Sequence, residues 1–457
     1  MTGAVNTKIK LREKVAYGLG DVGFNFYWTS ISAFLLIFYT DVFGISAAAA
    51  GTMLLVTKII DAFTDPMMGA MADRTKSRFG KFRPYLLWLA IPLAAAGVLT
   101  FTTPDLSNNG KLLWAYATYT LMMLLYTAIN IPYSALSGVI TADSQQRTTL
   151  ISFRFIGGFT GGVLVTYLIP KMVPVLGQGN DVLGWQLTMA MFGIAAAVMF
   201  LTTFLFTRER IEPLSEKPDS ILRDLKDLKD NKPWVVLFAL ALIIMVCIVM
   251  RAGSGAYYFR YYVERPDLVG EFLSTYMVAL ALGAASTPLM TRFMDKKKLM
   301  MLLMGLAGCL SISLFFVPPN AVGLIFAINI AIGFVLGPKS PLAFSMYADT
   351  ADYNEWRTGR RATAMTFSAA TFSQKLGGAL ASAVIGWVLA LLGYVANEQQ
   401  SDGSQLGILL LMSIIPGVIA LISAFVMRFY TLDSQQLVGI QLDLQKRKDA
   451  ASNLPLI

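Results

Sequence analysis

Two aspartates, Asp61 and Asp65, lie four residues apart inside a long apolar stretch of the sequence. At this spacing in a helix they share one face, about one turn from each other. Two carboxylates this close in a medium of low dielectric constant cannot both ionise cheaply, so one takes a proton or a small cation lies between them. A cation-coupled carrier needs this chemistry. The alternative is that Lys58, three residues before Asp61, neutralises it, which would leave Asp65 uncompensated.

Other ionisable side chains also lie in apolar stretches. A charged side chain near the centre of a bilayer costs at least about 2.5 kcal/mol, so each one is a candidate functional residue. They are Asp21, Lys58, Arg154, Arg251, Lys339 and Lys375. Arg154 and Lys375 could donate hydrogen bonds to solute hydroxyls or pair with a carboxylate, and both roles are open at this stage.

Asp21 lies in a stretch that also contains glycines, Asn25 and the aromatic cluster of residues 24–28. The glycines permit close helix contact, and the rings could stack on the apolar face of a sugar. Without Asn25, ordinary packing would be the better explanation of the rings, so Asn25 is what favours a sugar site. Asn130 precedes Pro132, which frees a backbone carbonyl inside the membrane or simply kinks the helix.

The elements that must position these residues are transmembrane helices. Hydrophobic residue types make up 56% of the 457 residues and charged types 14%, whereas a soluble domain carries about 25% charged residues. Apolar stretches of about 20 residues recur, and only helices satisfy their backbone within one such segment. The predicted spans are 15–40, 46–72, 84–103, 112–137, 149–170, 185–207, 234–259, 269–291, 298–317, 320–347, 365–393 and 405–429.

Lysines and arginines are distributed unequally between alternate loops. One set of loops, together with both termini, carries most of them, and the other set carries only Lys111, Lys171, Arg260 and Arg265. The positive-inside rule places the first set, and therefore both termini, in the cytoplasm. The net charge of +9 is then a topological signal that faces anionic lipid, and we expect no nucleic-acid partner. No removable signal peptide is expected.

The composition excludes several kinds of site. The sequence has no histidine, which excludes histidine metal sites, Ser-His-Asp and Cys-His catalysis and histidine proton relays. Cys247 and Cys309 both fall in apolar stretches and are expected to be small core residues. We therefore expect no enzyme activity, no cofactor and no metal apart from a coupling ion at Asp61 and Asp65.

A hydrophilic segment rich in proline, aspartate and lysine divides the predicted spans into six and six. We interpret it as a cytoplasmic linker with one surface helix near 219–230. Similar cation-rich turns follow the second and the eighth span, which suggests two related halves. The predicted parts are an N-terminal six-helix bundle (1–207), the linker (208–233), a C-terminal six-helix bundle (234–430) and a cytoplasmic tail (431–457). This all-α arrangement of twelve transmembrane helices resembles the major facilitator fold.

Four motifs together resemble one family. They are Tyr17-Gly18-Leu19-Gly20-Asp21, Asp61-Ala62-Phe63-Thr64-Asp65-Pro66, Gly80-Lys81-Phe82-Arg83-Pro84 and Ala348-Asp349-Thr350-Ala351-Asp352-Tyr353-Asn354-Glu355-Trp356. The pattern resembles the glycoside-pentoside-hexuronide:cation symporters, the melibiose permease-like group of the major facilitator superfamily. The last motif is expected in a cytoplasmic loop before the eleventh span. The resemblance implies symport of a sugar or glycoside (a pentoside, hexoside or hexuronide) with a proton or sodium ion into the cytoplasm by alternating access.

The resemblance also implies roles for individual residues. The implied cation site consists of Asp61, Thr64, Asp65, Thr127 and Thr371. The implied sugar site consists of Asp21, Asn25, Tyr126, Asn130 and Arg154, with Lys375 between the two sites.

Some of these positions depart from the melibiose permease-like pattern. Asn25 and Asn130 stand where it has aspartates, and Ser134 and Ser340 stand where it has tryptophans, so melibiose itself is not the expected substrate. Thr64 stands where it has asparagine. This change removes one amide oxygen ligand, which favours the proton over sodium as the coupling ion.

Two alternatives remain open. A membrane-embedded enzyme of glycoconjugate metabolism would need an acid-base or metal cluster at the interface, and the candidates are Asp349, Asp352 and Glu355. Because Arg357, Arg360 and Arg361 flank them, ion pairs that hold one transport state are favoured over a metal site. The other alternative is an exporter of another small solute. In either transport case we expect a multi-pass protein of the inner (cytoplasmic) membrane that contacts lipid and functions as a monomer.

Overall fold

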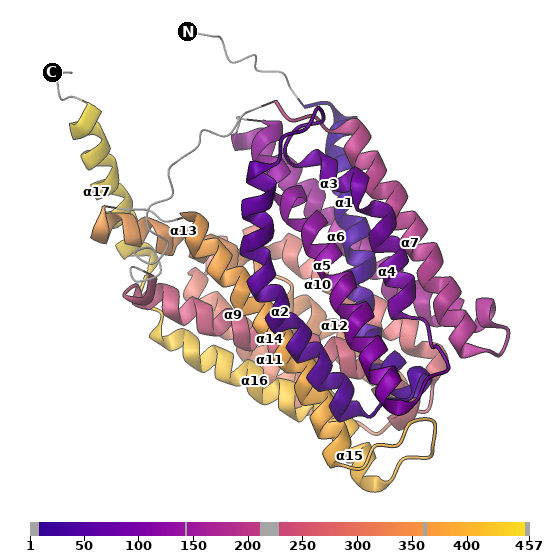
Figure 1. Ribbon diagram of the computed structural model, residues 1–457. Coiled ribbons are helices and arrows are strands. Elements are labelled where there is room, and N and C mark those ends of the chain that lie inside the picture. Colours follow the sequence, from indigo (N-terminus) through magenta and orange to yellow (C-terminus); the bar gives the residue numbers. More distant parts are fainter. Residues whose placement is uncertain (1–8, 142–143, 211–227, 360–362, 453–457) are drawn as a thin grey trace. The chain divides into compact units, whose positions relative to one another are not determined.

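The computed structural model describes residues 9–141, 144–210, 228–359 and 363–452. All regular secondary structure in these residues is helical (Figure 1). Nine helical segments among them are long and apolar enough to cross a membrane, and Ala90–Thr100 is a shorter apolar helix. The surface helix predicted near 219–230 lies largely outside the described residues.

The first six predicted spans are all helical. Their helices are α1 (Leu11–Ser30) with the π-helices η1 (Ile31–Leu35) and η2 (Phe38–Phe43), α2 (Ala47–Arg74), the pair α3 (Arg83–Trp88) and α4 (Ala90–Thr100), α5 (Asn108–Ile140), α6 (Ser144–Gly177) and α7 (Asp181–Phe206). Three of these helices, α2, α5 and α7, are capped at the N-terminus by a side-chain oxygen, from Ser46, Ser107 and Asn180 respectively. Each accepts a hydrogen bond of 3.2–3.3 Å from the backbone N–H three residues further on, which satisfies a donor that the helix leaves unpaired.

The second six predicted spans are helical as well. Their helices are α9 (Lys232–Tyr257) with η3 (Tyr258–Tyr262), η4 (Pro266–Leu268) with α10 (Val269–Phe293), α11 (Lys296–Ser313) with η5 (Leu314–Phe316), α12 (Val322–Leu336) with α13 (Lys339–Thr358), α14 (Thr363–Leu391), and α15 (Asp402–Met412) with α16 (Ile414–Val426) and η6 (Met427–Phe429). A further helix, α17 (Ser434–Ser452), follows in the predicted tail.

Residues 348–356, predicted to form a loop before the eleventh span, are helical instead. Helix α13 runs through them and ends at Gly359, whose φ of 72° is the left-handed conformation that commonly terminates a helix. The prediction of a loop is wrong because it relied on polarity alone. No glycine or proline interrupts the chain between Leu342 and Thr358, so the helix continues past its apolar part.

The predicted span 320–347 is divided into α12 and α13 around Gly337 and Pro338. Proline lacks the N–H that would continue the hydrogen-bond pattern of the helix. A Cβ atom at Gly337 would lie 2.4 Å from the main-chain oxygen of Leu280 on α10. Only glycine therefore permits α10 and the start of α13 to approach each other this closely.

Contacts within the chain define two compact units. The first consists of Met1–Ser215, Ala252–Met277 and Ser382–Ile408, and the second of Glu216–Arg251, Val278–Ala381 and Leu409–Ile457. Helices α9, α10, α14 and α15 contribute residues to both units. In the first unit α1 packs against α6 and α7, and α5 packs against α2 and α4 (Figure 1). In the second unit α11 packs against α12 and α16, and α13 packs against α17.

Glycines set the distance between α1 and α6 in the first unit. A Cβ atom at Gly157 would lie 2.1 Å from the main-chain oxygen of Gly18, and one at Gly161 would lie 2.8 Å from that of Val22. Real Cβ atoms do not come so close to backbone, so the two helices can meet only where side chains are absent. This contact fixes Asp21 of α1 opposite Arg154 of α6.

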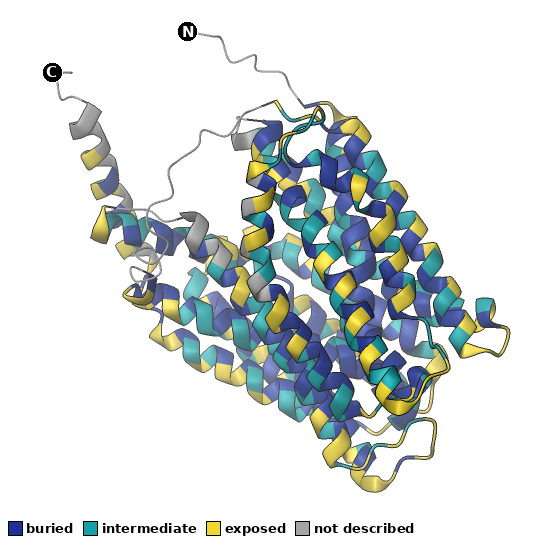
Figure 2. Cartoon of the chain, viewed as in Figure 1, coloured by how far each residue is buried: buried dark blue, intermediate teal, exposed yellow. Residues whose placement is uncertain are grey.

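Large apolar side chains lie exposed along the helices, while others fill the interior of each unit (Figure 2). Leu113 of α5 and Ile194 of α7 expose 72% and 65% of their surface, whereas Leu93 of α4 and Phe200 of α7 are fully buried. An exterior as apolar as this suits hydrocarbon and not water. Together with the long apolar helices, it makes the chain a multi-pass membrane protein.

Candidate functional site

The predicted pair of aspartates meets at a single hydroxyl group. Thr127 Oγ1 of α5 lies 2.6 Å from Asp61 Oδ1 and 3.2 Å from Asp65 Oδ1, both on α2. A hydroxyl has one proton to donate, so it can satisfy only one carboxylate at a time. Asp61 and Thr127 are both buried. The arrangement concentrates negative charge around one oxygen-rich point inside the first unit, where a proton or a small cation would relieve the repulsion.

Two further predicted cation-site residues differ in their positions. The Thr64 hydroxyl donates a hydrogen bond of 3.0 Å to the main-chain oxygen of Asp61. Its proton is therefore held by its own helix, while its oxygen remains able to accept or to coordinate. Thr371 is exposed on α14 and belongs to the second unit, so it is not among the residues that the first unit brings together.

An ion pair joins α1 to α6 at the predicted sugar site. Arg154 Nε donates a hydrogen bond of 2.8 Å to Asp21 Oδ1, and the two side chains expose 29% and 15% of their surface. The guanidinium also lies 5.1 Å from the centre of the Tyr133 ring. Of the two roles that the sequence leaves open for Arg154, carboxylate pairing is therefore present.

Three other predicted sugar-site residues lie on α1 and α5. Asn25 Nδ2 donates to the main-chain oxygen of Asp21 at 3.0 Å, which leaves its amide oxygen pointing elsewhere. Tyr126 of α5 meets the edge of Phe24 with ring centres 5.4 Å apart. Asn130, one turn further along α5, is partly exposed. A side-chain amide offers both donors and acceptors, which suits a ligand rich in hydroxyls.

Tyr126 connects the two predicted sites. It interacts electrostatically with Asp21 and Arg154 of one predicted site and with Asp61 and Asp65 of the other. It is also adjacent in sequence to the threonine that bridges the acidic pair. Lys375, predicted to lie between the sites, is on α14 in the second unit.

Sequence reasoning missed Gly158 of α6. A Cβ atom there would lie 2.7 Å from Asp21 Oδ2 and 3.1 Å from Asn25 Nδ2. The absence of a side chain lets the carboxylate and the amide approach the backbone of α6 this closely. The glycine-rich run 157–162 was a signal for close packing, but it did not distinguish the glycine that faces polar side chains from those that face backbone.

Two buried cations have protein contacts that explain them. Lys58 Nζ lies 4.5 Å from the centre of the Trp28 ring, a favourable position for a cation over an aromatic face. Arg251, in the second unit, donates 3.0 Å to the main-chain oxygen of Met412 and 2.8 Å to Asn329 Oδ1. Pro416 lacks the N–H that would otherwise bond to Met412, so Arg251 satisfies a carbonyl that the helix leaves open.

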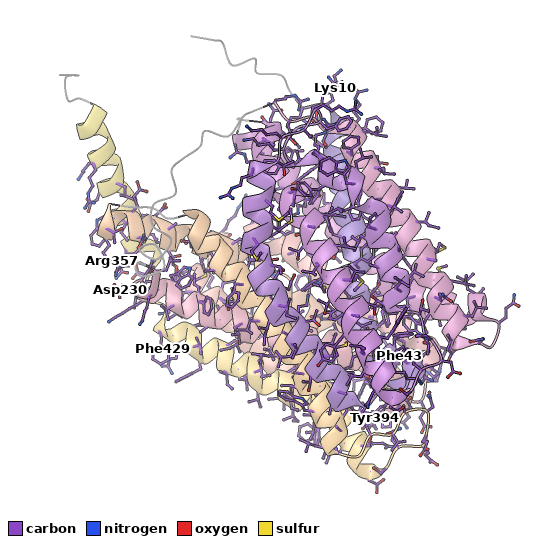
Figure 3. All side chains as sticks on the ribbon, in the orientation of Figure 1. Lys10, Phe43, Asp230, Arg357, Tyr394 and Phe429 are labelled. Atoms are coloured by element: carbon purple, nitrogen blue, oxygen red, sulfur yellow. The ribbon has the colours of Figure 1, made fainter. Side chains whose placement is uncertain are left out.

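The polar end of α13 forms contacts within the second unit. Asp349 pairs with Lys296 of α11 at 2.7 Å. Arg357 donates to the main-chain oxygen of Asp230, and these two residues lie together in Figure 3. The predicted partners Arg360 and Arg361 lie outside the described residues.

The motif at residues 80–84 binds the side-chain carboxylate of Glu209 from the same chain. The backbone N–H groups of Lys81, Phe82 and Arg83 donate to Glu209 at 2.8–2.9 Å. Gly80 has φ of 106°, and a Cβ atom there would lie 2.4 Å from the carboxyl carbon of Glu209. The motif thus secures the start of α3 to the segment that follows α7.

A second contact holds the same segment. Arg210 makes two hydrogen bonds to Glu13 of α1, at 2.8 and 2.9 Å. The hydrogen bonds to Glu13 raise the pKa of Arg210. A two-point guanidinium–carboxylate pair fixes orientation as well as distance, so the start of α1 and the segment after α7 are held together.

Comparisons with known proteins agree with the fold. A family model described as MFS/sugar transport protein matches residues 16–434. The inner membrane symporter YicJ of Escherichia coli (strain K12) is 37% identical over 442 residues, which cover 96% of each chain. The isoprimeverose transporter of Lactiplantibacillus pentosus is 36% identical over 430 residues, which cover 92% of this chain and 88% of that protein. A crystal structure of a D-xylose-proton symporter matches with a TM-score of 0.66 at 14% identity, covering 93% of this chain and 99% of that chain, and shows likeness of fold.

Proposed function

Because the chain belongs to the MFS/sugar transport protein family, we propose that it carries a sugar or glycoside into the cytoplasm together with a cation, by alternating access. It has the major facilitator fold of twelve transmembrane helices in two six-helix bundles. The observation that carries the proposal is the bridge from Thr127 to Asp61 and Asp65, one residue from Tyr126, which adjoins the ion pair of Asp21.

The cation would bind first at Asp61 and Asp65, with Thr127 and Thr64 as hydroxyl ligands and Thr371 as a further predicted contact. A bound proton or sodium ion removes the repulsion between the two carboxylates. We favour the proton, because the position next to Asp65 is a threonine whose hydroxyl proton is held by the backbone, and not an asparagine with a free amide oxygen.

The sugar would bind at Asp21, Asn25, Tyr126, Asn130 and Arg154, with Lys375 as a further predicted contact. Carboxylate, amide and guanidinium groups offer both donors and acceptors to ring hydroxyls, and Tyr126 offers an aromatic face. A pentoside, hexoside or hexuronide fits this chemistry. The relative named as an isoprimeverose transporter supports a glycoside.

Coupling would act through Tyr126, which adjoins both sites. A cation that neutralises the acidic pair changes the electrostatic field at the sugar site, and a bound sugar changes it at the acidic pair. Such coupling is reciprocal, so each ligand must raise the affinity of the other by the same factor.

The test compares net uptake with exchange in proteoliposomes. Replacing Asp65 with Cys should abolish uphill accumulation of a radiolabelled glycoside under an imposed proton or sodium gradient. Exchange of labelled for unlabelled sugar should persist, because the sugar site is intact. The matched control is Asp267→Asn, which removes an exposed acid that pairs with Arg265 at 2.8 Å. Uphill accumulation that survives unchanged in D65C would show that the cation site lies elsewhere.

A further inference from the structure

Asp41 is a buried acid that the proposed cation and sugar sites do not use. It lies in η2, at the end of the first predicted span, and its side chain exposes 1% of its surface. Figure 3 shows the neighbouring Phe43 at the opposite end of the first unit from Lys10. Burying a carboxylate is costly unless hydrogen bonds and charge satisfy it, so its surroundings need an explanation.

Hydroxyl groups from three segments satisfy both carboxylate oxygens. Thr40 and Tyr394 donate to Oδ1 at 2.6 and 2.5 Å, and Tyr261 donates to Oδ2. Arg260 Nη1 lies 3.6 Å from Oδ2. Hydrogen-bond donors and a guanidinium thus surround the carboxylate and replace water at both of its oxygens.

The same segments are tied together by further bonds. Asn397 Nδ2 donates 2.6 Å to the main-chain oxygen of Asp41, and its backbone N–H donates 3.1 Å to the hydroxyl of Tyr261. Tyr257 shares a hydrogen bond of 2.8 Å with Thr40. We call these residues the Asp41 cluster: Thr40, Asp41, Tyr257, Arg260, Tyr261, Tyr394 and Asn397.

The cluster joins parts of the chain that are far apart in sequence. Its members come from the end of α1 with η2, from the end of α9 with η3, and from the segment after α14. The Tyr394 ring meets the edges of Tyr257 and Tyr261 with centres 5.4 Å apart in each pair. Tyr394 and Phe43 lie at the same end of the molecule in Figure 3. Asp41 is the common acceptor, since each of the other segments donates a hydrogen bond to it.

Close packing of α2 against α14 lies at this same end of the first unit. A Cβ atom at Gly386 would lie 2.2 Å from the main-chain oxygen of Ala47, and Trp387 Nε1 donates 3.1 Å to Thr52 Oγ1. No solute-sized path can pass between backbones that approach this closely. At the end of the unit that carries the Asp41 cluster, the space between α2 and α14 is therefore closed in this structure.

We propose that the Asp41 cluster is the gate at the end predicted to face away from the cytoplasm, and that breaking its hydrogen bonds opens that end to solute. The proposal rests on transport by alternating access, but on neither the solute nor the coupling ion. In the closed state three hydroxyls replace water around the carboxylate. In the open state Asp41 is hydrated, and the ends of α9 and α14 separate from η2.

The charge on Asp41 makes it the most sensitive point of the cluster. Hydrogen bonds to a charged group are stronger than those between neutral groups, and Asp41 accepts several of them. Replacing Asp41 with Asn keeps the size but removes the charge and turns one acceptor into an NH₂ group facing hydroxyl donors. Replacing Tyr394 with Phe keeps the ring packing and removes one hydrogen bond.

The experiment measures how often the gate opens. In a variant with Cys247→Ala, Cys309→Ala and Ser254→Cys, the only thiol lies on α9 one turn before Tyr257, at a position that is 1% exposed. The rate of its alkylation by a charged maleimide is measured on full-length protein in lipid nanodiscs, with unfolded protein as the measure of complete reaction. Asp41→Asn and Tyr394→Phe should each raise this rate by about tenfold or more, since one hydrogen bond to a charged group contributes at least that factor.

The matched control is Asp267→Asn, an exposed acid that pairs with Arg265, two residues away in the sequence. Its alkylation rate should equal that of the parent. The proposal is overturned if Asp41→Asn and Tyr394→Phe leave the rate at the parent value, or if all three variants raise it equally. Should Asp41→Asn fail to fold, Tyr394→Phe decides. Because no sugar or cation gradient is used, a failure here is distinct from a failure of the proposed symport.

Discussion

The hydroxyl of Thr127 is the smallest feature on which the proposed cation site depends. Both carboxylates reach it, at 2.6 and 3.2 Å, from positions one helical turn apart. Helical periodicity alone predicts that Asp61 and Asp65 share a face. It does not predict which residue of another helix meets them, and here the resemblance to a known family supplied Thr127. Its contact with both acids is a finding of the structure.

Replacing Thr127 with Val tests this contact. Valine has nearly the same shape but no hydroxyl, so the acidic pair loses a shared donor and a cation loses a ligand. We expect the apparent affinity for the coupling ion to fall by about tenfold, the effect of one hydrogen bond to a charged group. Replacing Thr127 with Ser, which keeps the hydroxyl, should change the apparent affinity for the coupling ion by no more than about threefold from that of the parent. Half-maximal cation concentration for glycoside uptake is the measurement, and equal values for T127V and T127S would contradict the assignment.

Replacing Gly158 with Ala tests the proposed sugar site. The added Cβ atom would lie 2.7 Å from Asp21 Oδ2, and the carboxylate must move although Arg154 holds it at 2.8 Å. We expect glycoside affinity to fall by about tenfold or more, the loss of one charge-assisted contact. Gly138→Ala, on the exposed side of α5 with no atom within 4 Å, should leave it unchanged. Binding to purified protein gives the two affinities. An unaltered affinity in G158A would remove Asp21 and Asn25 from the sugar site.

At the scale of elements, Arg251 shows how one side chain completes a helix of the second unit. The carbonyl of Met412 lacks its helical donor because residue 416 is proline, and Arg251 bonds to it at 3.0 Å. The length of the apolar stretch predicts the span 405–429 from sequence. It does not predict which side chain bonds to the carbonyl that the proline leaves unpaired. Arg251 was a candidate for solute binding on charge alone, and the structure gives it partners within the protein.

Replacing Arg251 with Met should destabilise the protein by about 2 kcal/mol or more, because the buried carbonyl of Met412 and the amide of Asn329 lose a charged donor. Adding Pro416→Ala to R251M restores an N–H for Met412 and should recover about 1 kcal/mol. The same Pro416→Ala change in the parent should have a smaller effect. Thermal unfolding of the four proteins in one detergent measures this coupling. Additive effects of the two changes would contradict it.

Helix α13 marks the limit of sequence reasoning about elements. Its polar part was expected to be a loop because hydropathy ends there. The chain nevertheless stays helical to Thr358, where Gly359 supplies the positive φ that ends it. The length of an apolar stretch indicates where a helix leaves the bilayer, whereas glycine and proline indicate where the helix itself ends. The two signals differ for any helix that extends beyond the membrane.

At the scale of the whole molecule, composition and loop charge predict the membrane fold, and the family comparison supports it. The Asp41 cluster could not be predicted in the same way. Asp41 lies at the end of a predicted span, where an acidic residue does not by itself indicate a site. Its partners Tyr261 and Tyr394 are 220 and 353 residues away in the sequence. Only the folded chain brings them together. Contacts between residues so far apart in sequence depend on the topology of the fold. Local sequence patterns do not predict them.

We propose that the cation and the sugar bind to one coupled pair of sites. The most direct measurement is the dissociation constant of a transported glycoside with purified protein, at saturating and at vanishing coupling-ion concentration, together with the ion's affinity with and without the glycoside. Protons and sodium are each tested as the coupling ion. We expect that one of them raises glycoside affinity, and that the glycoside raises the affinity for that ion by the same factor. Glycoside affinity that is independent of both ions would contradict it.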